Sequence, residues 1–291
     1  MLVVMGAGWG MTQPLSKIAV DGGYRQFGLV FWQVVITALV LGVICLWRRR
    51  AIPLGRAQLL AGLVIALVGT VLPNAASYAA LVHLPSGLVS ILLSLVPMLA
   101  FPVALLLGNE KFQMKRLAGL AFGLAGVLLI VLPEASLPDR AMVVYIPLAM
   151  VAPLCYAMEG NYVARWGTAG LGPLRLLFVA SVTAALIAGP LALLNGQFID
   201  PRGPYGVADL ALVASAFIHA AVYTTYVWLV GRAGPVFAVQ VSYLVTAFGV
   251  VWAMWLLGER YSLWVWAAFG LLLVGLALVQ PRADVKPEKE A

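Results

Sequence analysis

The chain has 291 residues, of which 63% are hydrophobic and only 10% are charged, whereas soluble domains carry about 25% charged residues. This composition excludes an ordinary soluble domain and indicates an integral membrane protein. The net charge is +7, but the basic residues gather in particular breaks between apolar stretches, so the charge indicates membrane topology and not nucleic-acid binding.

Ten apolar stretches are long enough for membrane helices, since a helix crosses the roughly 30 Å hydrocarbon core in about 20 residues. In chain order they cover residues 2–20, 27–47, 57–82, 86–107, 116–132, 142–164, 174–194, 206–230, 235–257 and 262–280. The first stretch lacks the basic start and cleavage pattern of a signal peptide, so we expect it to remain as the first helix. Residues 281–291 have the composition of a disordered, solvated tail.

The first predicted helix carries polar and kinking residues in the segment GWGMTQPLSK: Trp9, Thr12, Gln13, Pro14, Ser16 and Lys17. Pro14 has no backbone N–H and tends to kink a helix, which would free a carbonyl group near residue 10. We therefore expect a first helix that is kinked at Pro14, which would act as a hinge, and whose polar groups face the protein interior.

Polar side chains three or four positions apart, and therefore on one helix face, recur in the later helices. They are Gln33 and Thr37 in the second helix; Thr70, Asn74 and Tyr78 in the third; Ser90 and Ser94 in the fourth; Tyr156, Glu159 and Asn161 in the sixth; Ser215, His219, Tyr223 and Tyr226 in the eighth; and Gln240 and Tyr243 in the ninth. For a single Ser or Thr the simplest interpretation is a hydrogen bond between helices. For the whole set, we predict one aqueous cavity enclosed by the first four helices and by the sixth to ninth.

The candidate substrate contacts in this cavity come from both halves of the chain: Trp9, Thr12, Gln13, Lys17, Asn74, Tyr78, Tyr223, Gln240 and Tyr243. Secondary candidates are Gln33, Ser90, Ser94 and His219. Tryptophans near helix ends are typical of the membrane interface, so Trp228, Trp252, Trp255, Trp264 and Trp266 are left out.

The fifth and tenth helices are expected to be scaffold. Between residues 117–132 and 263–279 the only polar side-chain groups are the indole N–H groups of Trp264 and Trp266. Gly119, Gly123 and Gly126 form a small-residue face that could pack against another helix. We expect a monomer that contacts membrane lipids and a small-molecule substrate, with no nucleic-acid partner.

Glu159 and Lys17 are the ionisable residues inside predicted spans, where such residues are functional candidates. At 1.5 Å per residue their depths differ by about 17 Å, so we do not expect them to pair. Lys17 could contact a substrate carboxylate or extend to the headgroups. Glu159 is the coupling candidate, able to hold an amine or a proton; the alternative is a water-solvated structural carboxylate. Beside it, Gly160 could act as a hinge.

The basic residues predict the orientation. With the N-terminus inside, thirteen fall in inner loops and the tail: Arg48, Arg49, Arg50, Arg56, Lys111, Lys115, Arg116, Arg165, Arg175, Arg232, Arg282, Lys286 and Lys289. Four fall outside: Arg25, Arg140, Arg202 and Arg260. Since membrane proteins retain Lys and Arg on the cytoplasmic side, both termini are predicted to be cytoplasmic, in a multi-pass protein of the cell (inner) membrane.

The two halves of the chain resemble each other. Residues 85–110 align with 235–259 at an offset of 150 that falls to 149 after a glycine, and both segments end in LLG followed by an acid. WGMTQPL (9–15) lies over YAMEGNY (156–162) at an offset of 147. A five-helix unit crosses the membrane an odd number of times, so the second copy must be inverted, as in many secondary transporters. We predict an all-α membrane protein with repeats at 1–140 and 141–280 and a tail at 281–291.

The segment GWGMTQPLSKIA (8–19) and the two LLG(N)E endings resemble EamA-type members of the drug/metabolite transporter superfamily, and this resemblance covers nearly the whole chain. It implies a basket-like carrier of ten helices with a central cavity, most assigned members being exporters of amino acids or related small metabolites. The family often has an arginine in the second helix where this chain has Gln33, so no anion contact is carried over to that position.

The expected function is secondary transport by alternating access, with export of amino acids or related metabolites placed first. An uptake permease for a vitamin or similar nutrient, and a passive channel or structural membrane component, are the alternatives. The sequence contains no metalloprotease, serine-hydrolase or P-loop motif. We therefore expect no enzyme, no catalytic residue, no cofactor and no metal site.

Overall fold

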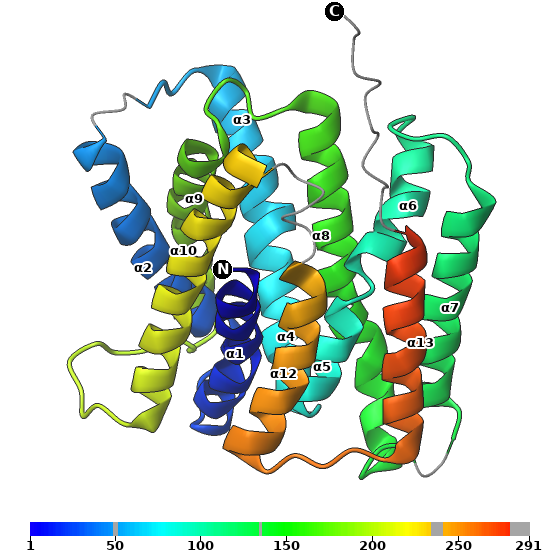
Figure 1. The fold of residues 1–291 in the computed structure, drawn as a ribbon. Helices are drawn as coiled ribbons and strands as arrows, with labels where there is room; N and C mark the ends of the chain where they lie inside the picture. Colours follow the sequence, from blue (N-terminus) through cyan, green and yellow to red (C-terminus); the bar gives the residue numbers. More distant parts are fainter. Residues whose placement is uncertain (49–51, 134–135, 234–240, 280–291) are drawn as a thin grey trace, which may run out of the picture.

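The computed structural model describes residues 1–48, 52–133, 136–233 and 241–279, and these residues form a bundle of helices (Figure 1). The elements are α1 (Leu2–Asp21), α2 (Gln26–Trp47), α3 (Arg56–Val64), the π-helical η1 (Ile65–Val71), α4 (Leu72–Leu81), α5 (Ser86–Leu93), α6 (Val96–Leu106), α7 (Met114–Val131), the 3₁₀-helical η2 (Arg140–Tyr145), α8 (Ile146–Trp166), α9 (Pro173–Leu194), α10 (Val207–Ala233), α12 (Val241–Leu257) and α13 (Leu263–Val279). The expected all-helical fold is confirmed over these ranges.

Seven of the described helical segments are long and apolar enough to cross a membrane. The other three predicted spans correspond to α1, which has 20 residues but a more polar composition, and to α12 and α13, which have 17 residues each. The membrane character is therefore clear, while the count of ten crossing helices stays a prediction.

Three predicted helices are less regular than expected. The third contains the π-helical segment η1, and the sixth is preceded by the 3₁₀ segment η2. The fourth, predicted as one helix over 86–107, is divided into α5 and α6 at residues 94–95. The prediction of one unbroken helix is therefore wrong. Pro97 explains the break, since it lies at the start of α6 and has no backbone N–H to bond to the preceding turn. By contrast, α1 runs unbroken through Pro14.

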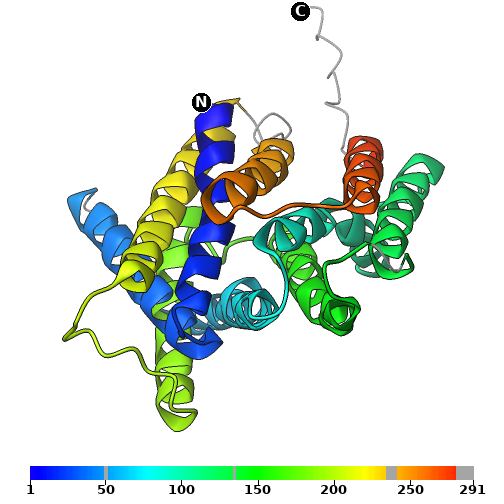
Figure 2. The same cartoon turned by 90° about the horizontal axis from the view of Figure 1, so that it is seen from below.

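The helix packing repeats itself between the two halves. α1 packs against α10 and α12, and α8 packs in the same way against α4 and α6; α2 pairs with α9, and α7 with α13. In the last pair, Gly119 lies against Gly275 and Val279, whereas Gly126 lies against Ala268 and Leu272. The two helices therefore run in opposite directions, as inverted units require, and Figure 2 shows them together at one edge of the bundle.

The basic residues gather at one end of the bundle. The turns from α2 to α3, from α6 to α7 and from α8 to α9, together with the end of α10, lie at the upper end in Figure 1. Of the thirteen basic residues expected inside, the eight that the structure describes are in or beside these turns. We call this the basic end, and the opposite end, with Arg25, Arg140, Arg202 and Arg260, the arginine-poor end.

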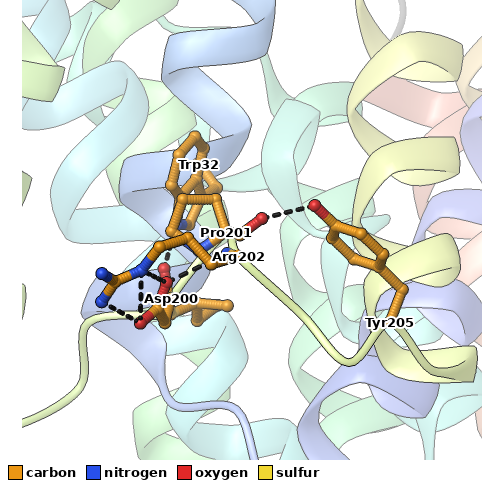
Figure 3. A network of polar contacts seen from close by, with 6 residues as sticks. Trp32, Asp200, Pro201, Arg202 and Tyr205 are labelled. Atoms are coloured by element: carbon orange, nitrogen blue, oxygen red, sulfur yellow. Dashed lines mark hydrogen bonds and ion pairs between the residues drawn. The ribbon is translucent and has the colours of Figure 1, made fainter.

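The loop between α9 and α10 lies at the arginine-poor end and is fastened to α2 (Figure 3). The indole of Trp32 donates a hydrogen bond to the carbonyl of Ile199 at 2.9 Å. Asp200 and Arg202 form an exposed ion pair at 2.7 Å, and hydrogen bonds from Arg202 lower the pKa of the Asp200 carboxyl. The hydroxyl of Tyr205 donates to the carbonyl of Pro201 at 2.5 Å. The bond from Trp32 holds this second-half loop against a first-half helix, while the other two contacts lie within the loop.

Candidate substrate site

Glu159 projects from α8 toward the π-helical segment of the third span. Its carboxyl atoms lie so close to Gly69 that a Cβ atom at that position would overlap them. A π-helical turn widens the helix, and such turns are frequent at functional sites. Within the described residues the Glu159 carboxylate accepts no hydrogen bond and joins no ion pair. It is therefore available to a cationic group or a proton.

Two tyrosines lie near this carboxylate, and one of them is hydrogen-bonded to an amide side chain. Tyr156, one turn earlier on α8, donates its hydroxyl to the side-chain carbonyl of Asn74 on α4 at 2.9 Å. Tyr156 and Tyr223, the latter on α10, are near enough for electrostatic interaction with Glu159. The predicted contacts Asn74 and Tyr223 thus come together with the predicted coupling residue, from three different helices.

A second polar pair lies one turn further along α4, on the same face as Asn74. The hydroxyl of Tyr78 donates to the side-chain oxygen of Gln33 on α2, and both residues are buried, with 6% and 7% of their surface exposed. Buried polar groups are normally hydrogen-bonded, and this bond joins the secondary candidate Gln33 to the candidate substrate contact Tyr78.

Rings from α1 and α10 form an aromatic group beside the carboxylate. The ring of Trp9 lies 6.1 Å from that of His219 and 5.4 Å from that of Tyr226, and His219 stacks on Tyr223 at 6.4 Å. The indole nitrogen of Trp9 and the side-chain oxygen of Gln13 are buried without a hydrogen-bond partner among the described residues. Buried polar atoms are normally paired, so these two can serve a bound solute.

We call the residues of these contacts the polar cluster: Trp9, Gln13, Gln33, Gly69, Asn74, Tyr78, Tyr156, Glu159, His219, Tyr223 and Tyr226. The only charged side chain among them is Glu159. Its members lie on α1, α2, η1, α4, α8 and α10, so both halves of the chain contribute.

Lys17 lies apart from this cluster. Its ammonium group donates to the carbonyl of Leu81 at 2.8 Å and pairs with Asp21, one turn further along α1, at 3.0 Å. The two chain-internal partners satisfy most of its hydrogen-bonding capacity. The two expectations for Lys17, a contact to a substrate carboxylate and an extension to the headgroups, both stay predictions.

Three of the remaining candidate residues have hydroxyls that are bonded to nearby backbone carbonyls. Thr12 donates to the carbonyl of Trp9 at 2.7 Å, Ser90 to that of Ser86 at 3.0 Å, and Ser94 to that of Ile91 at 2.7 Å. These three hydroxyls are bonded within their own segments. Tyr243 packs, partly buried, against the hydrophobic core. Gln240 lies outside the described residues.

A cavity of about 310 Å³ opens between α6 and α8 on the side of the basic end. Its walls include Pro97 and Ala100 from α6 and Tyr156 and Gly160 from α8, while Glu110 and Arg116 are among its polar lining residues. A Cβ atom on Gly160 would meet nothing within 4 Å. Because Tyr156 belongs to both, the cavity adjoins the polar cluster.

Sequence reasoning missed several residues that the structure brings to the site. Tyr156 and Tyr226 were on the polar stripes but were not selected, and Gly69 had no signal, since nothing in the sequence marks a π-helical turn. Trp252 was assigned to the membrane interface; its indole instead donates to the carbonyl of Ala7 at 2.9 Å and joins α12 to α1. In the described part of the chain, no three His, Cys, Asp or Glu side chains are grouped as metal ligands.

Comparison with known proteins identifies the architecture. The profile of the EamA-like transporter family matches the chain twice, over residues 1–132 and 143–280. A solved structure described only as "Crystal structure of protein" matches with a TM-score of 0.65 at 18% sequence identity, covering 95% of this chain and 94% of that one. At this identity the likeness concerns the fold alone. No curated protein matches significantly.

Proposed function

Because this chain belongs to the EamA-like transporter family, a family of membrane transporters, we propose that it is a secondary transporter that exports amino acids or related small metabolites. The observation that carries this proposal is the unpaired carboxylate of Glu159 among Gly69, Tyr156 and Tyr223, where both halves of the chain meet. A carboxylate in the membrane interior without a partner is a typical mark of a substrate or proton site.

In this proposal the amine of the substrate binds to Glu159. The apolar or aromatic part of the substrate lies against the rings of Trp9, Tyr223 and Tyr226. The indole N–H of Trp9 and the side-chain oxygen of Gln13, which have no partner among the described residues, bind its polar atoms. Alternation of Glu159 between an amine and a proton would couple export to a proton gradient.

The two halves would move relative to each other during transport. Antiparallel packing of α7 on α13, and the equivalent packing of α1 and α8 on their neighbours, support inverted repeats over 1–140 and 141–280. Such repeats expose a central site alternately to the two sides of a membrane. The edge position of α7 and α13 suits a scaffold, and the glycine face of α7 is covered by α13 and by Met98 of the same chain.

The basic end is the proposed cytoplasmic face of a cell (inner) membrane protein, because Lys and Arg are retained on that side. The ends of α2 and α10 and the start of α3 lie there (Figure 1). Both termini are placed on the same side by this proposal.

Flux of labelled amino acids in proteoliposomes, measured with and without a pH gradient, tests the proposal. Saturable flux that follows the gradient is expected from a coupled exporter. No flux of any amino acid contradicts the export proposal. Inward accumulation of a vitamin would instead support the uptake permease, and flux that rises linearly without saturation would support a channel.

A further inference from the structure

The glutamate of the LLGE segment in the second repeat forms a group of hydrogen bonds with the first repeat. The carboxylate of Glu259, just after α12, accepts from the backbone N–H of Ser86 at 2.7 Å and from its hydroxyl at 2.8 Å. Its other oxygen accepts from the N–H of Gly87 at 3.1 Å and from the hydroxyl of Tyr261. The acid of the LLGE segment therefore joins two segments that are 173 residues apart.

These bonds place a negative charge at the N-terminus of α5, which begins at Ser86. The first N–H groups of a helix have no partner within the helix, and a carboxylate there is stabilised by charge-assisted bonds and by the helix dipole. The ring of Tyr261 is held at the same place, since a Cβ atom on Gly87 would overlap its hydroxyl. Only glycine at position 87 leaves room for this closure.

The segments beside this contact are tightly packed. α1 and α12 touch at Gly10 and Gly249, where a Cβ atom on Gly10 would lie 2.7 Å from the backbone nitrogen of Gly249. The hydroxyl of Ser90 on α5 would lie 2.6 Å from a Cβ atom on Gly249. α1, α5 and α12 therefore meet without space between them on the side of the arginine-poor end.

The corresponding place in the other half of the chain is different. Glu110, the repeat counterpart of Glu259, pairs with Arg116 at the basic end and lines the cavity of about 310 Å³. Ala157, which the repeat alignment places over Gly10, lines the same cavity. The positions that correspond to Ser86 and Gly87, 236 and 237, lie outside the described residues. Among the described residues, hydrogen bonds close the crossing at Glu259, whereas Glu110 and Ala157 line a cavity in the other half.

From this asymmetry we infer that Glu259 is a latch, which closes the path at the arginine-poor end by holding the N-terminus of α5 against the end of α12. The structure is then the state open toward the basic end. Transport requires the Glu259 carboxylate to leave the N–H groups of Ser86 and Gly87. This latch would act in the same way whichever solute the path carries.

Cysteine accessibility in the purified full-length protein tests the latch. In a background with Cys45 and Cys155 replaced by alanine, Ser90→Cys reports on the closed crossing, where Ser90 packs against Gly249, and Gly160→Cys reports on the open cavity. The probe is a charged, membrane-impermeant maleimide. Replacing the carboxylate of Glu259 by an amide roughly halves the strength of the bonds it accepts, so Glu259→Gln is expected to increase labelling at position 90 by about tenfold. Labelling at position 160 should fall.

Glu110→Gln is the matched control, since it removes the counterpart carboxylate and should not increase labelling at position 90. If Glu259→Gln unfolds the protein, Ser86→Ala removes one donor and leaves both backbone bonds, and a smaller increase at position 90 is expected. Labelling rates that stay unchanged in a folded Glu259→Gln or Ser86→Ala protein would overturn the latch.

Discussion

Replacing Gly69 with alanine would put a methyl group where the Glu159 carboxylate now lies. All three carboxyl atoms would be under 3.0 Å from the new Cβ atom. Ordinary contact between such atoms is about 3.5–4.0 Å, so the carboxylate must move by about 1 Å. A hydrogen bond to a charged group contributes about 1.5–3 kcal/mol. If the displaced carboxylate of Glu159 loses its bond to the substrate amine, the KM for substrate should rise by about 10- to 150-fold.

The assay for Gly69→Ala is the concentration dependence of flux in proteoliposomes, together with thermal unfolding in detergent. Gly270→Ala on α13 is the matched control, because a Cβ atom there meets nothing within 4 Å, and its KM should equal that of the wild type. A Gly69→Ala protein that is folded and keeps the wild-type KM would refute the placement of substrate at Glu159.

Two further variants test the scaffold and the arginine-poor end. Gly119→Leu should lower the stability by about 1–3 kcal/mol through overpacking, since even a Cβ atom would lie 2.7 Å from the carbonyl of Gly275; unfolding in detergent, with Gly270→Leu as control, measures this. Burial, and then the hydrogen bond to Asp209, raise the pKa of Tyr24 to about 12. The stabilisation from Tyr24 is therefore complete below about pH 10, its unfolded pKa, and is lost as pH rises toward 12. Tyr24→Phe should remove this loss of stability between about pH 10 and 12, as measured by the unfolding temperature in detergent at each pH. A variant whose unfolding temperature depends on pH as the wild type's does would contradict this assignment.

The membrane character and the family could be predicted from the sequence because they rest on features repeated along the whole chain. Long apolar stretches, clustered basic residues and the two LLG(N)E endings each carry the same information several times. Local irregularities could not be predicted in this way. The π-helical turn at Gly69 and the break after Ser94 depend on how neighbouring helices pack, and a helical periodicity of 3.6 residues does not record that.

The sequence was enough to predict which helices contribute to the candidate site, but not which side chains contact each other there. Glu159, Asn74, Tyr78 and Tyr223 were selected because polar side chains in a membrane must face a partner or water. The structure then pairs Lys17 with Asp21, an acid just beyond the predicted first span. A polar stripe shows which face of a helix is turned inward, but the partner comes from another helix and requires the fold.

The role of Glu259 illustrates the same limit. Its LLGE segment identified the family, but the partners Ser86 and Gly87 belong to the other repeat. Only the folded chain brings the end of α12 to the start of α5.

The most direct test of the account is the concentration dependence of labelled-substrate exchange in proteoliposomes that contain Glu159→Gln, beside the wild type and the surface variant Asp139→Asn. The account predicts that the wild type and Asp139→Asn exchange substrate with saturation, and that Glu159→Gln loses the saturable component while remaining folded. Glu159→Gln with the KM and maximal rate of the wild type would contradict it.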